Sequence, residues 1–413
     1  MQHLEARYGP SDLVTRQLAF EQAVGGGFIT LGNNVKLLEN GPATYAEMFR
    51  LIMQARQSIN LETFIFTDDA IGQEFANTLI YKQLQGVQVH VIYDSLGSIS
   101  TPDKFFDQMR RNGIHVLRFD PLNPFSRRFR LGRITHRDHR KLLIVDGQVA
   151  ITGGINVSGV YEQRESNAFF SGSSERSRMF SAEPALAWHD TDIEVTGPAV
   201  AEYQKLFVQT WQHQEGWPLD LTILYPPLKR TGPMMVHVIG SEARGLSVIY
   251  ITLISAINNA QESVYITDPY FAPDHQVLGA LKAAARRGVD VRLLLPTVTD
   301  EPLIAAAARS HYDSLLDAGI KIYQWNGTML HSKTAVIDGV WSTVGSSNLD
   351  WWSIARNNEV NTVVLNQDFG AQMVAHFQDD LKNAKQIDPR QWDERPFSEK
   401  AHEWAARMVQ PIL

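Results

Sequence analysis

The sequence predicts an α/β fold made of two similar halves, each built around a largely parallel sheet. A chain of 413 residues is too long for one ordinary core and fits two domains of about 150 to 200 residues. Apolar residues make up 44% and charged residues 20% of the composition, which is typical of a folded chain. The same order of apolar runs also occurs twice along the sequence, which indicates an internal repeat.

Each half alternates strands with helices, an order that predicts crossover units and a mainly parallel sheet. In the first half we expect strands at 58–66, 86–94 and 112–119 and a helix at 75–85; in the second half the counterparts are strands at 263–271, 288–296 and 318–325 and a helix at 278–287.

The repeat also predicts where the domains begin and end. We expect an N-terminal extension at 1–29, a first domain at 30–212, a linker at 213–233, a second domain at 234–385 and a C-terminal amphipathic segment at 386–413.

The closest match between the halves is a motif of the form H-x-K-x4-D followed by Asn. The distance from His to Asn is 17 positions in each copy (156 − 139 and 348 − 331). A single copy of so short a motif occurs often by chance, whereas two copies at matched spacing indicate a function. The motif residues are His139, Lys141, Asp146 and Asn156 in the first half and His331, Lys333, Asp338 and Asn348 in the second.

These residue types suit phosphoryl chemistry. On a strand, positions i and i+2 share a face, so we expect each histidine and its lysine to point the same way. One histidine can attack phosphorus while the other protonates the leaving oxygen. The lysines and asparagines can hold the phosphate oxygens, so we expect no metal and no cofactor in the reaction. We count Asp146 and Asp338 with the site but expect a mainly structural role, tying the strand end into it.

A carboxylate should orient each imidazole through its second ring nitrogen. Asp190 and Glu359 lie at equivalent places downstream of the two motifs and suit that role. The chain has no cysteine, which excludes thiolate metal sites, cysteine nucleophiles and disulfides.

The paired motifs resemble the phospholipase D superfamily, and more specifically the shorter bacterial cardiolipin synthases without membrane spans. Supporting stretches are 37–41, 61–64, 136–141, 344–350 and 395–398. The resemblance implies two similar α/β/α sandwich domains with mixed, mostly parallel sheets, related by pseudo-twofold symmetry and sharing an active site at their interface. It also implies a phosphatidyl-enzyme intermediate on histidine, with His139 as the nucleophile and His331 as the general acid.

The sequence offers two segments that could contact a membrane. The first, residues 122–141, is rich in arginine in a chain of net charge −7, so we expect it to bind anionic headgroups; a solvated loop is the alternative. Its candidate contacts are Arg127, Arg128, Arg130, Phe125 and Phe129, and it also holds Arg137 and Arg140. The second is an apolar stripe that we expect to pack on the protein's own surface, with membrane binding as the alternative; it comprises Phe397, Ala401, Trp404, Ala405, Met408, Val409 and Ile412.

Four functions remain open. The first is a phosphatidyltransferase that makes cardiolipin from phosphatidylglycerol, and the second is a phospholipase D that hydrolyses phospholipids. A phosphodiesterase nuclease is disfavoured by 38 basic against 45 acidic residues, so no nucleic-acid partner is expected; a lipid-binding scaffold would not need two intact motifs. No window of the sequence resembles a membrane span or a signal peptide. We expect a peripheral protein on the cytoplasmic face of a bacterial inner membrane, with the periplasm as the alternative and the oligomeric state open.

Overall fold

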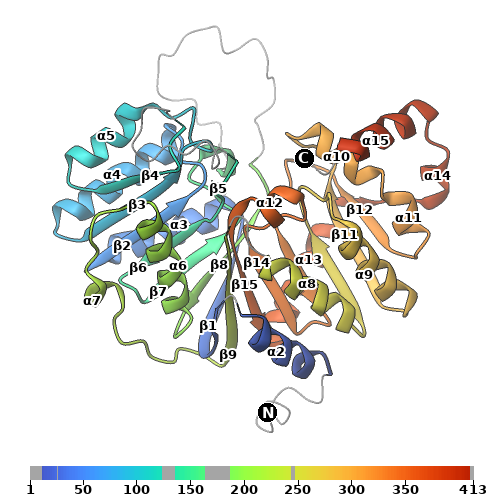
Figure 1. The fold of residues 1–413 in the computed structure, drawn as a ribbon, viewed down its shortest axis with the longest axis horizontal. Helices are drawn as coiled ribbons and strands as arrows, with labels where there is room; N and C mark the ends of the chain where they lie inside the picture. The colour runs from blue at the N-terminus through green and yellow to red at the C-terminus, as the bar shows by residue number, and fades with distance from the viewer. Residues whose placement is uncertain (1–11, 26, 123–134, 163–186, 243–246, 410–413) are drawn as a thin grey trace.

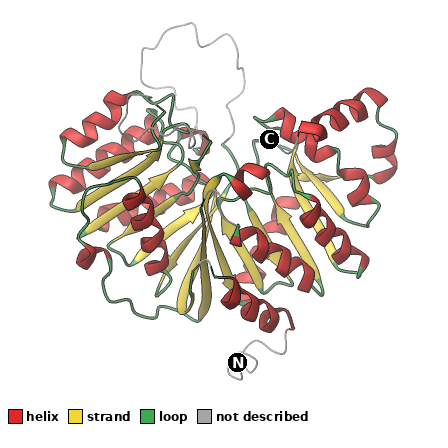
Figure 2. Ribbon diagram, viewed as in Figure 1, coloured by secondary structure: helices red, strands yellow, loops and turns green. Residues whose placement is uncertain are grey.

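The computed structural model describes residues 12–25, 27–122, 135–162, 187–242 and 247–409. Within these ranges, one mixed sheet runs through the whole molecule, with helices on its outside (Figures 1 and 2). The strands lie in the order β4-β3-β2-β6-β7-β8-β1-β9-β15-β14-β13-β10-β11-β12-β16, and β5 pairs with β15. Outward from the central pair β1–β9, the strands of the two halves follow in corresponding order, which agrees with the repeat in the sequence; the second half adds β16 at its edge.

The first half comprises β1 (Ile29–Glu39), α3 (Asn40–Gln54), β2 (Ser58–Thr63), α4 (Ala70–Leu84), β3 (Gln88–Asp94), α5 (Asp103–Arg111), β4 (His115–Phe119), β5 (Arg137–Asp138), β6 (Leu142–Val145), β7 (Val149–Gly153), a 3₁₀ turn (Gly159–Tyr161), β8 (Thr191–Thr196), α6 (Val200–His213) and α7 (Leu221–Leu224). The second half comprises β9 (Met234–Ser241), α8 (Val248–Asn259), β10 (Ser263–Thr267), α9 (His275–Arg286), β11 (Asp290–Pro296), α10 (Pro302–Arg309), α11 (Tyr312–Leu316), β12 (Lys321–Trp325), β13 (Thr334–Ile337), β14 (Trp341–Gly345), α12 (Trp351–Ala355), β15 (Asn357–Leu365), α13 (Gln367–Leu381), β16 (Ala384–Gln386), α14 (Pro389–Asp393) and α15 (Phe397–Val409).

The α/β class and the mixed sheet are confirmed, but the expectation of mostly parallel strands is wrong. Among the described strands, parallel pairing is confined to β2–β3–β4, to β10–β11–β12 and to β5 with β15; two isolated bridges, Phe66 with Val157 and His189 with Leu330, are also parallel. The motif strands β6 and β13 instead start antiparallel hairpins. The reason is the tight turn after each motif: Asp146 and Gly147 both have positive φ, as do Asp338 and Gly339, and such turns reverse the chain directly.

Helices cover both faces of the sheet, because alternate residues of the strands enter different apolar clusters. In β6, Leu143 and Val145 pack with α3, α4 and α5, whereas Leu142 and Ile144 pack with α6. The second cluster continues across the central strands into the second half, where it includes Phe369 of α13. The two halves therefore share part of one core, and the domain boundaries expected from the sequence stay a prediction.

The helix α2 (Asp12–Val24) precedes the repeat and packs on the second half. Its Glu21 carboxylate accepts from Trp341 Nε1 at 2.9 Å and lies 3.0 Å from His237 Nδ1. Within the described ranges, none of the helices combines the length and the apolar content that crossing a bilayer requires.

Candidate active site at the junction of the two halves

A cavity of about 490 Å³ opens where the two halves meet. The two motif histidines, His139 and His331, line it together with the two asparagines, Asn156 and Asn348. Residues that are 192 positions apart in the sequence (331 − 139 and 348 − 156) therefore face one space, as the repeat predicts for a shared site.

Backbone pairing between the halves places His139 beside a carboxylate. The short strand β5, just before His139, pairs with the first residues of β15, and the His139 N–H donates to the Asn358 carbonyl at 2.9 Å. The next residue of β15 is Glu359, whose Oε2 lies 3.0 Å from His139 Nδ1. Both groups are buried, at 9% and 0% exposure.

The second histidine is held in the reciprocal way. A bridge joins His189 to Leu330, and the His331 N–H donates to the His189 carbonyl at 2.7 Å. Asp190 Oδ2 then lies 2.6 Å from His331 Nδ1, and the Tyr161 hydroxyl lies 3.3 Å from the same nitrogen. Each histidine thus pairs with the carboxylate of the other half, a crossing that the spacing of residues does not predict.

The pairing leaves Nε2 of each imidazole for chemistry in the cavity, because Nδ1 is engaged by the carboxylate. Burial, opposed by Glu359, lowers the pKa of His139, and burial together with Lys333 lowers the pKa of His331 to about 3. Burial would raise the pKa of Glu359, but His139 and Lys141 outweigh it and lower that pKa. Both imidazoles are therefore neutral at pH 7 before a substrate arrives, which suits a nucleophile.

The two motif lysines are both 2% exposed, and neither is among the described residues that line this cavity. Lys141 Nζ donates to the carbonyl of His139 at 2.6 Å, and Lys333 Nζ donates to the carbonyl of His331. Burial lowers the pKa of Lys141 to about 7, and Glu359 opposes the shift; burial also lowers the pKa of Lys333. Each ammonium group lies directly behind its own histidine, where an anion in the cavity would favour the charged form.

The two asparagines differ in how they are held. Asn156 Oδ1 accepts from the Ile65 N–H at 3.0 Å, and its amide donates to the Tyr161 hydroxyl at 3.1 Å. Asn348 is 6% exposed, and its Oδ1 is buried without a hydrogen-bond partner among the described residues. Both side chains line the cavity, but Asn156 is already hydrogen-bonded to two residues of the first half.

The structure corrects the placement of the two motif aspartates. Asp146 accepts from the backbone N–H groups of Arg56, Gln57 and Ser58, at the opposite end of β6 from the histidine. Asp338 makes the equivalent contacts to residues 261–263. Neither carboxylate is among the described residues that line the cavity. Their role is structural, but they hold the start of the neighbouring strand and do not tie the strand end into the site.

Sequence reasoning missed several residues of the cavity. Tyr161, Trp188 and Tyr270 pack around His331, with ring centroids 5.9, 5.3 and 6.1 Å from the imidazole. Asp300 and Glu301 line the mouth. These residues lie outside the two H-x-K-x4-D motifs, whose spacing was the only sequence signal for the site.

The five candidate headgroup contacts, Arg127, Arg128, Arg130, Phe125 and Phe129, lie outside the described residues. Two other arginines of the same basic stretch are described, and for them the surface-patch prediction is wrong. Arg137 and Arg140 are 3% and 2% exposed. Arg140 Nη2 donates to the Ser241 carbonyl at 2.8 Å, whereas Arg137 lines the cavity and its Nη1 donates to Ser95 Oγ at 3.0 Å.

The C-terminal helix is confirmed as α15, but for the described side chains of its apolar stripe the expectation that they pack on the protein is wrong; Ile412 and the side chain of Val409 lie outside the description. Phe397, Trp404 and Met408 are 83%, 64% and 66% exposed. The helix docks through its other side, where Ala406 packs on small residues of α10 and Glu403 pairs with Arg395 at 3.1 Å. Small side chains and an ion pair hold this helix, so its aromatic face is left to solvent.

The fold and the site, with the comparisons that follow, define a class: an α/β protein of the phospholipase D superfamily, in which the histidines and asparagines of two motif copies line one cavity. A family model described as "Cardiolipin synthase, PLD-like domain" matches residues 48–181 and 253–381. The chain is 31% identical over 405 residues to a cardiolipin synthase of Geobacillus sp. (strain WCH70), covering 96% of this chain and 76% of that one. It is 33% identical over 385 residues to cardiolipin synthase A of Pseudomonas aeruginosa (strain UCBPP-PA14), covering 93% of this chain and 74% of that one.

The chain therefore belongs to the cardiolipin synthase family with phospholipase D-like domains, and it is an enzyme of the phospholipase D type. A solved structure, that of phosphatidylserine synthase from Haemophilus influenzae Rd KW20, matches with a TM-score of 0.73 at 13% identity, over 96% of this chain and 100% of that one. At that identity, the match shows the fold alone.

Proposed function

We propose that the protein transfers a phosphatidyl group from one phosphatidylglycerol molecule to another and so makes cardiolipin. The observation that supports this most is the pair of imidazoles, each backed by a buried carboxylate, that face one cavity. The names of the relatives favour cardiolipin as the product.

In the first step, His139 Nε2 attacks the phosphorus of the donor. A P–N bond forms, the bond to the glycerol oxygen breaks, and His331 Nε2 gives its proton to that oxygen. The negative phosphate favours the protonated form of His331 on binding, which offsets the effect of burial on its pKa. Lys141, Lys333 and Asn348 hold the phosphate oxygens; the assignment of attack to His139 rests on the family resemblance.

In the second step, a hydroxyl of another phosphatidylglycerol attacks the phosphatidyl-histidine. His331, now neutral, takes the hydroxyl proton, the P–N bond breaks, and the new phosphodiester leaves. Water in place of the alcohol would give phosphatidic acid, which is the phospholipase D alternative. A nuclease would use the same first step on a nucleic acid.

Incubating the protein with phosphatidylglycerol labelled in its glycerol headgroup separates these functions. The proposal expects labelled cardiolipin together with free labelled glycerol. Phosphatidic acid as the main product would favour the phospholipase D alternative, and cleavage of oligonucleotides without lipid turnover would favour a nuclease. Turnover should persist in EDTA below the unfolding temperature, because the two steps need no metal.

We also propose that the face around the cavity mouth docks on an anionic membrane, at the cytoplasmic face of a bacterial inner membrane. Large apolar residues are exposed after β3 and β11 and on α10, α12 and α15, and they include Ile99, Val298, Leu303, Trp351 and Trp404. Exposed apolar groups of this kind insert at the level of the headgroups, and nearby arginines add attraction to anionic lipids.

Vesicle flotation across a salt series tests the docking face. Arg127→Ser, Arg128→Ser and Arg130→Ser together should weaken binding and flatten its salt dependence. Phe397→Ser with Trp404→Ser should weaken binding at every salt concentration, because apolar insertion is not screened. Lys382→Ser on the exposed end of α13 is the control. Flotation unchanged in both combined variants would contradict this docking face.

A further inference from the structure

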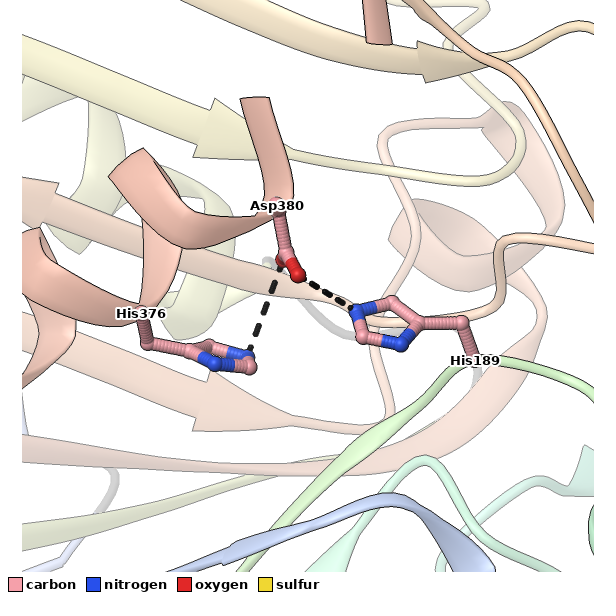
Figure 3. A group of neighbouring side chains, drawn as sticks. All are labelled: His189, His376 and Asp380. Carbon is pink, nitrogen blue, oxygen red and sulfur yellow. Dashed lines mark ion pairs between the residues drawn. The ribbon is translucent and has the colours of Figure 1, made fainter. Parts of the chain in front are cut away.

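A second cluster of histidine and carboxylate side chains lies outside the cavity, and it joins the two halves. Figure 3 shows His189 converging on His376 and Asp380. His189 belongs to the first-half segment that enters β8, whereas His376 and Asp380 lie four residues apart on α13 and so share one face of that helix. The three residues are buried, at 9%, 9% and 5% exposure.

The donor atoms of this cluster are already close together. His189 Nε2 lies 2.9 Å from Asp380 Oδ1, and His376 Nε2 lies 3.7 Å from Asp380 Oδ2. One ligand atom from each residue falls within 4.8 Å of the others. Tetrahedral Zn²⁺, with bonds of about 2.0–2.1 Å, holds its ligand atoms roughly 3.3 Å apart. Small side-chain rotations would therefore bring all three donors to one ion.

Hydrogen bonding accounts for only part of this arrangement: His376 Nε2 lies 3.3 Å from Thr191 Oγ1, a contact that a bound ion would have to replace. His189 Nε2 is buried and makes no hydrogen bond within the described chain, although Asp380 Oδ1 lies 2.9 Å away. Asp380 Oδ1 is therefore close to His189 Nε2 but does not lie along the direction in which an N–H bond at that nitrogen would point. The distance of 3.7 Å between His376 and Asp380 is also too long for a hydrogen bond. The nitrogen and oxygen atoms of the cluster point toward one space without hydrogen-bonding to one another. A cation in that space could bind them.

A further carboxylate stands behind the cluster. Glu39 Oε1 lies 3.6 Å from His376 Nδ1, the ring nitrogen away from Asp380. A histidine that binds a metal generally directs its other ring nitrogen to a carboxylate or carbonyl, which fixes the ring and raises its basicity. Glu39 is in the right place for that role.

We propose that His189, His376 and Asp380 form a binding site for Zn²⁺ that fastens the second half to the segment carrying Asp190. Two imidazoles and one carboxylate suit Zn²⁺, whereas Mg²⁺ and Ca²⁺ prefer oxygen ligands. Three protein ligands leave the fourth position for water. The ion would be structural: none of its three ligands is among the described residues lining the catalytic cavity, but the His189 carbonyl accepts from the His331 N–H.

Metal binding to the full chain tests the site directly. Protein stripped with chelator is titrated with ZnCl₂ in competition with a chromophoric chelator. We expect one Zn²⁺ per chain, a loss of affinity of roughly 100-fold or more in His376→Gln and in Asp380→Asn, and a loss of roughly tenfold in Glu39→Gln. His402→Gln, on the exposed side of α15, is the matched control and should bind like the parent.

Replacing Zn²⁺ by Co²⁺ keeps the test decisive if a ligand variant does not fold. The parent loaded with one Co²⁺ should show the intense visible absorption of four-coordinate cobalt, and X-ray absorption of the Zn²⁺ form should show two imidazoles at about 2.0–2.1 Å. A weak six-coordinate spectrum, no stoichiometric binding, or unchanged affinity in both ligand variants would each overturn the site, leaving a buried ion-pair cluster or an adventitious ion only. The readout is metal binding, so its failure is independent of any failure of the proposed transfer reaction.

Discussion

The two half-sites around the cavity reach the same chemistry with different supports. In the second half, Ser346 Oγ donates to Glu359, the carboxylate behind His139. The corresponding residue of the first half, 192 positions earlier, is Gly154, and a Cβ atom there would meet Asp190 Oδ1 at 2.2 Å. The Glu359 carboxylate is held by the hydroxyl group of Ser346, whereas the Asp190 carboxylate lies in the space that a side chain at Gly154 would fill. The repeat preserves the pairing of imidazole with carboxylate, not the residues that achieve it.

The half-sites also differ in charge. The second half carries two buried acids, Asp268 and Asp350, where the repeat places Thr63 and Ser158 in the first half. Burial, with Asp350 adding to it, raises the pKa of Asp268 to about 8, and burial, with Glu359 adding to it, raises the pKa of Asp350 to about 7. Asp350 lines the cavity. At these two positions the first half is therefore neutral, whereas the second half gains negative charge near neutral pH.

The largest expected effect separates the roles of the two histidines. His139→Ala and His331→Ala should each lower transfer by roughly 10³-fold or more, because each removes a group that acts in both steps. With a donor that carries a p-nitrophenol leaving group, His331→Ala should recover the first step, since that group leaves without a proton, and His139→Ala should not. Release of p-nitrophenol measures this. Recovery of His139→Ala instead would reverse the two roles.

The crossed pairing is tested by the two carboxylates, which are positioning residues. Glu359→Gln and Asp190→Asn should each slow transfer by roughly 10- to 100-fold, because the imidazole loses its orienting partner. With the p-nitrophenol donor, Asp190→Asn should recover the first step, as His331→Ala does. Glu359→Gln should not recover it, as is expected for His139→Ala. If recovery occurs in Glu359→Gln and not in Asp190→Asn, the pairing acts within each half and not across them.

A smaller effect is expected from the charged wall. Because the pKa of Asp350 is raised to about 7, its side chain is neutral below that pH and charged above it. KM for an anionic donor should rise a few-fold between pH 6 and pH 8 as the carboxylate ionises and repels the phosphate. In Asp350→Asn, which retains a good helix N-cap, this rise should become smaller; the loss of charge on Lys141, whose pKa is lowered to about 7, accounts for the remainder. Ser158→Ala is the matched change in the first half and should leave the rise at its full size; a rise of unchanged size in Asp350→Asn would assign it to another group.

A separate effect, on stability and not on activity, is expected in acid. The folded pKa of His331 is about 3, below an unfolded value of about 6.5, so the unfolded chain binds its proton first as pH falls. Its contribution to stability is complete above pH 6.5 and is lost progressively toward pH 3. In His331→Gln, unfolding free energy from urea titrations should fall less steeply in this window, by up to about 1.4 kcal/mol per pH unit. Equal slopes for parent and variant would mean that the folded protein protonates His331 readily.

The sequence by itself determined what depends on neighbouring residues and on the repeat. Apolar runs predicted the strands, and the two motif copies predicted that their histidines and asparagines face one cavity. These are local properties, because pleat, turn chemistry and spacing act within a few residues. The resemblance to the family rested on the same short stretches.

Only the tertiary structure decided which groups meet across long separations. Glu359 backs His139 and Asp190 backs His331 because β5 pairs with β15 and His189 bridges to Leu330. Those contacts join residues 220 and 141 positions apart, and the repeat alone allows either pairing. The direction of the β6 and β13 hairpins, the exposed aromatic face of α15 and the cluster of His189 with α13 were decided in the same way. Each of these features depends on which surfaces become buried when the whole chain folds, and a pattern within a few residues does not determine that.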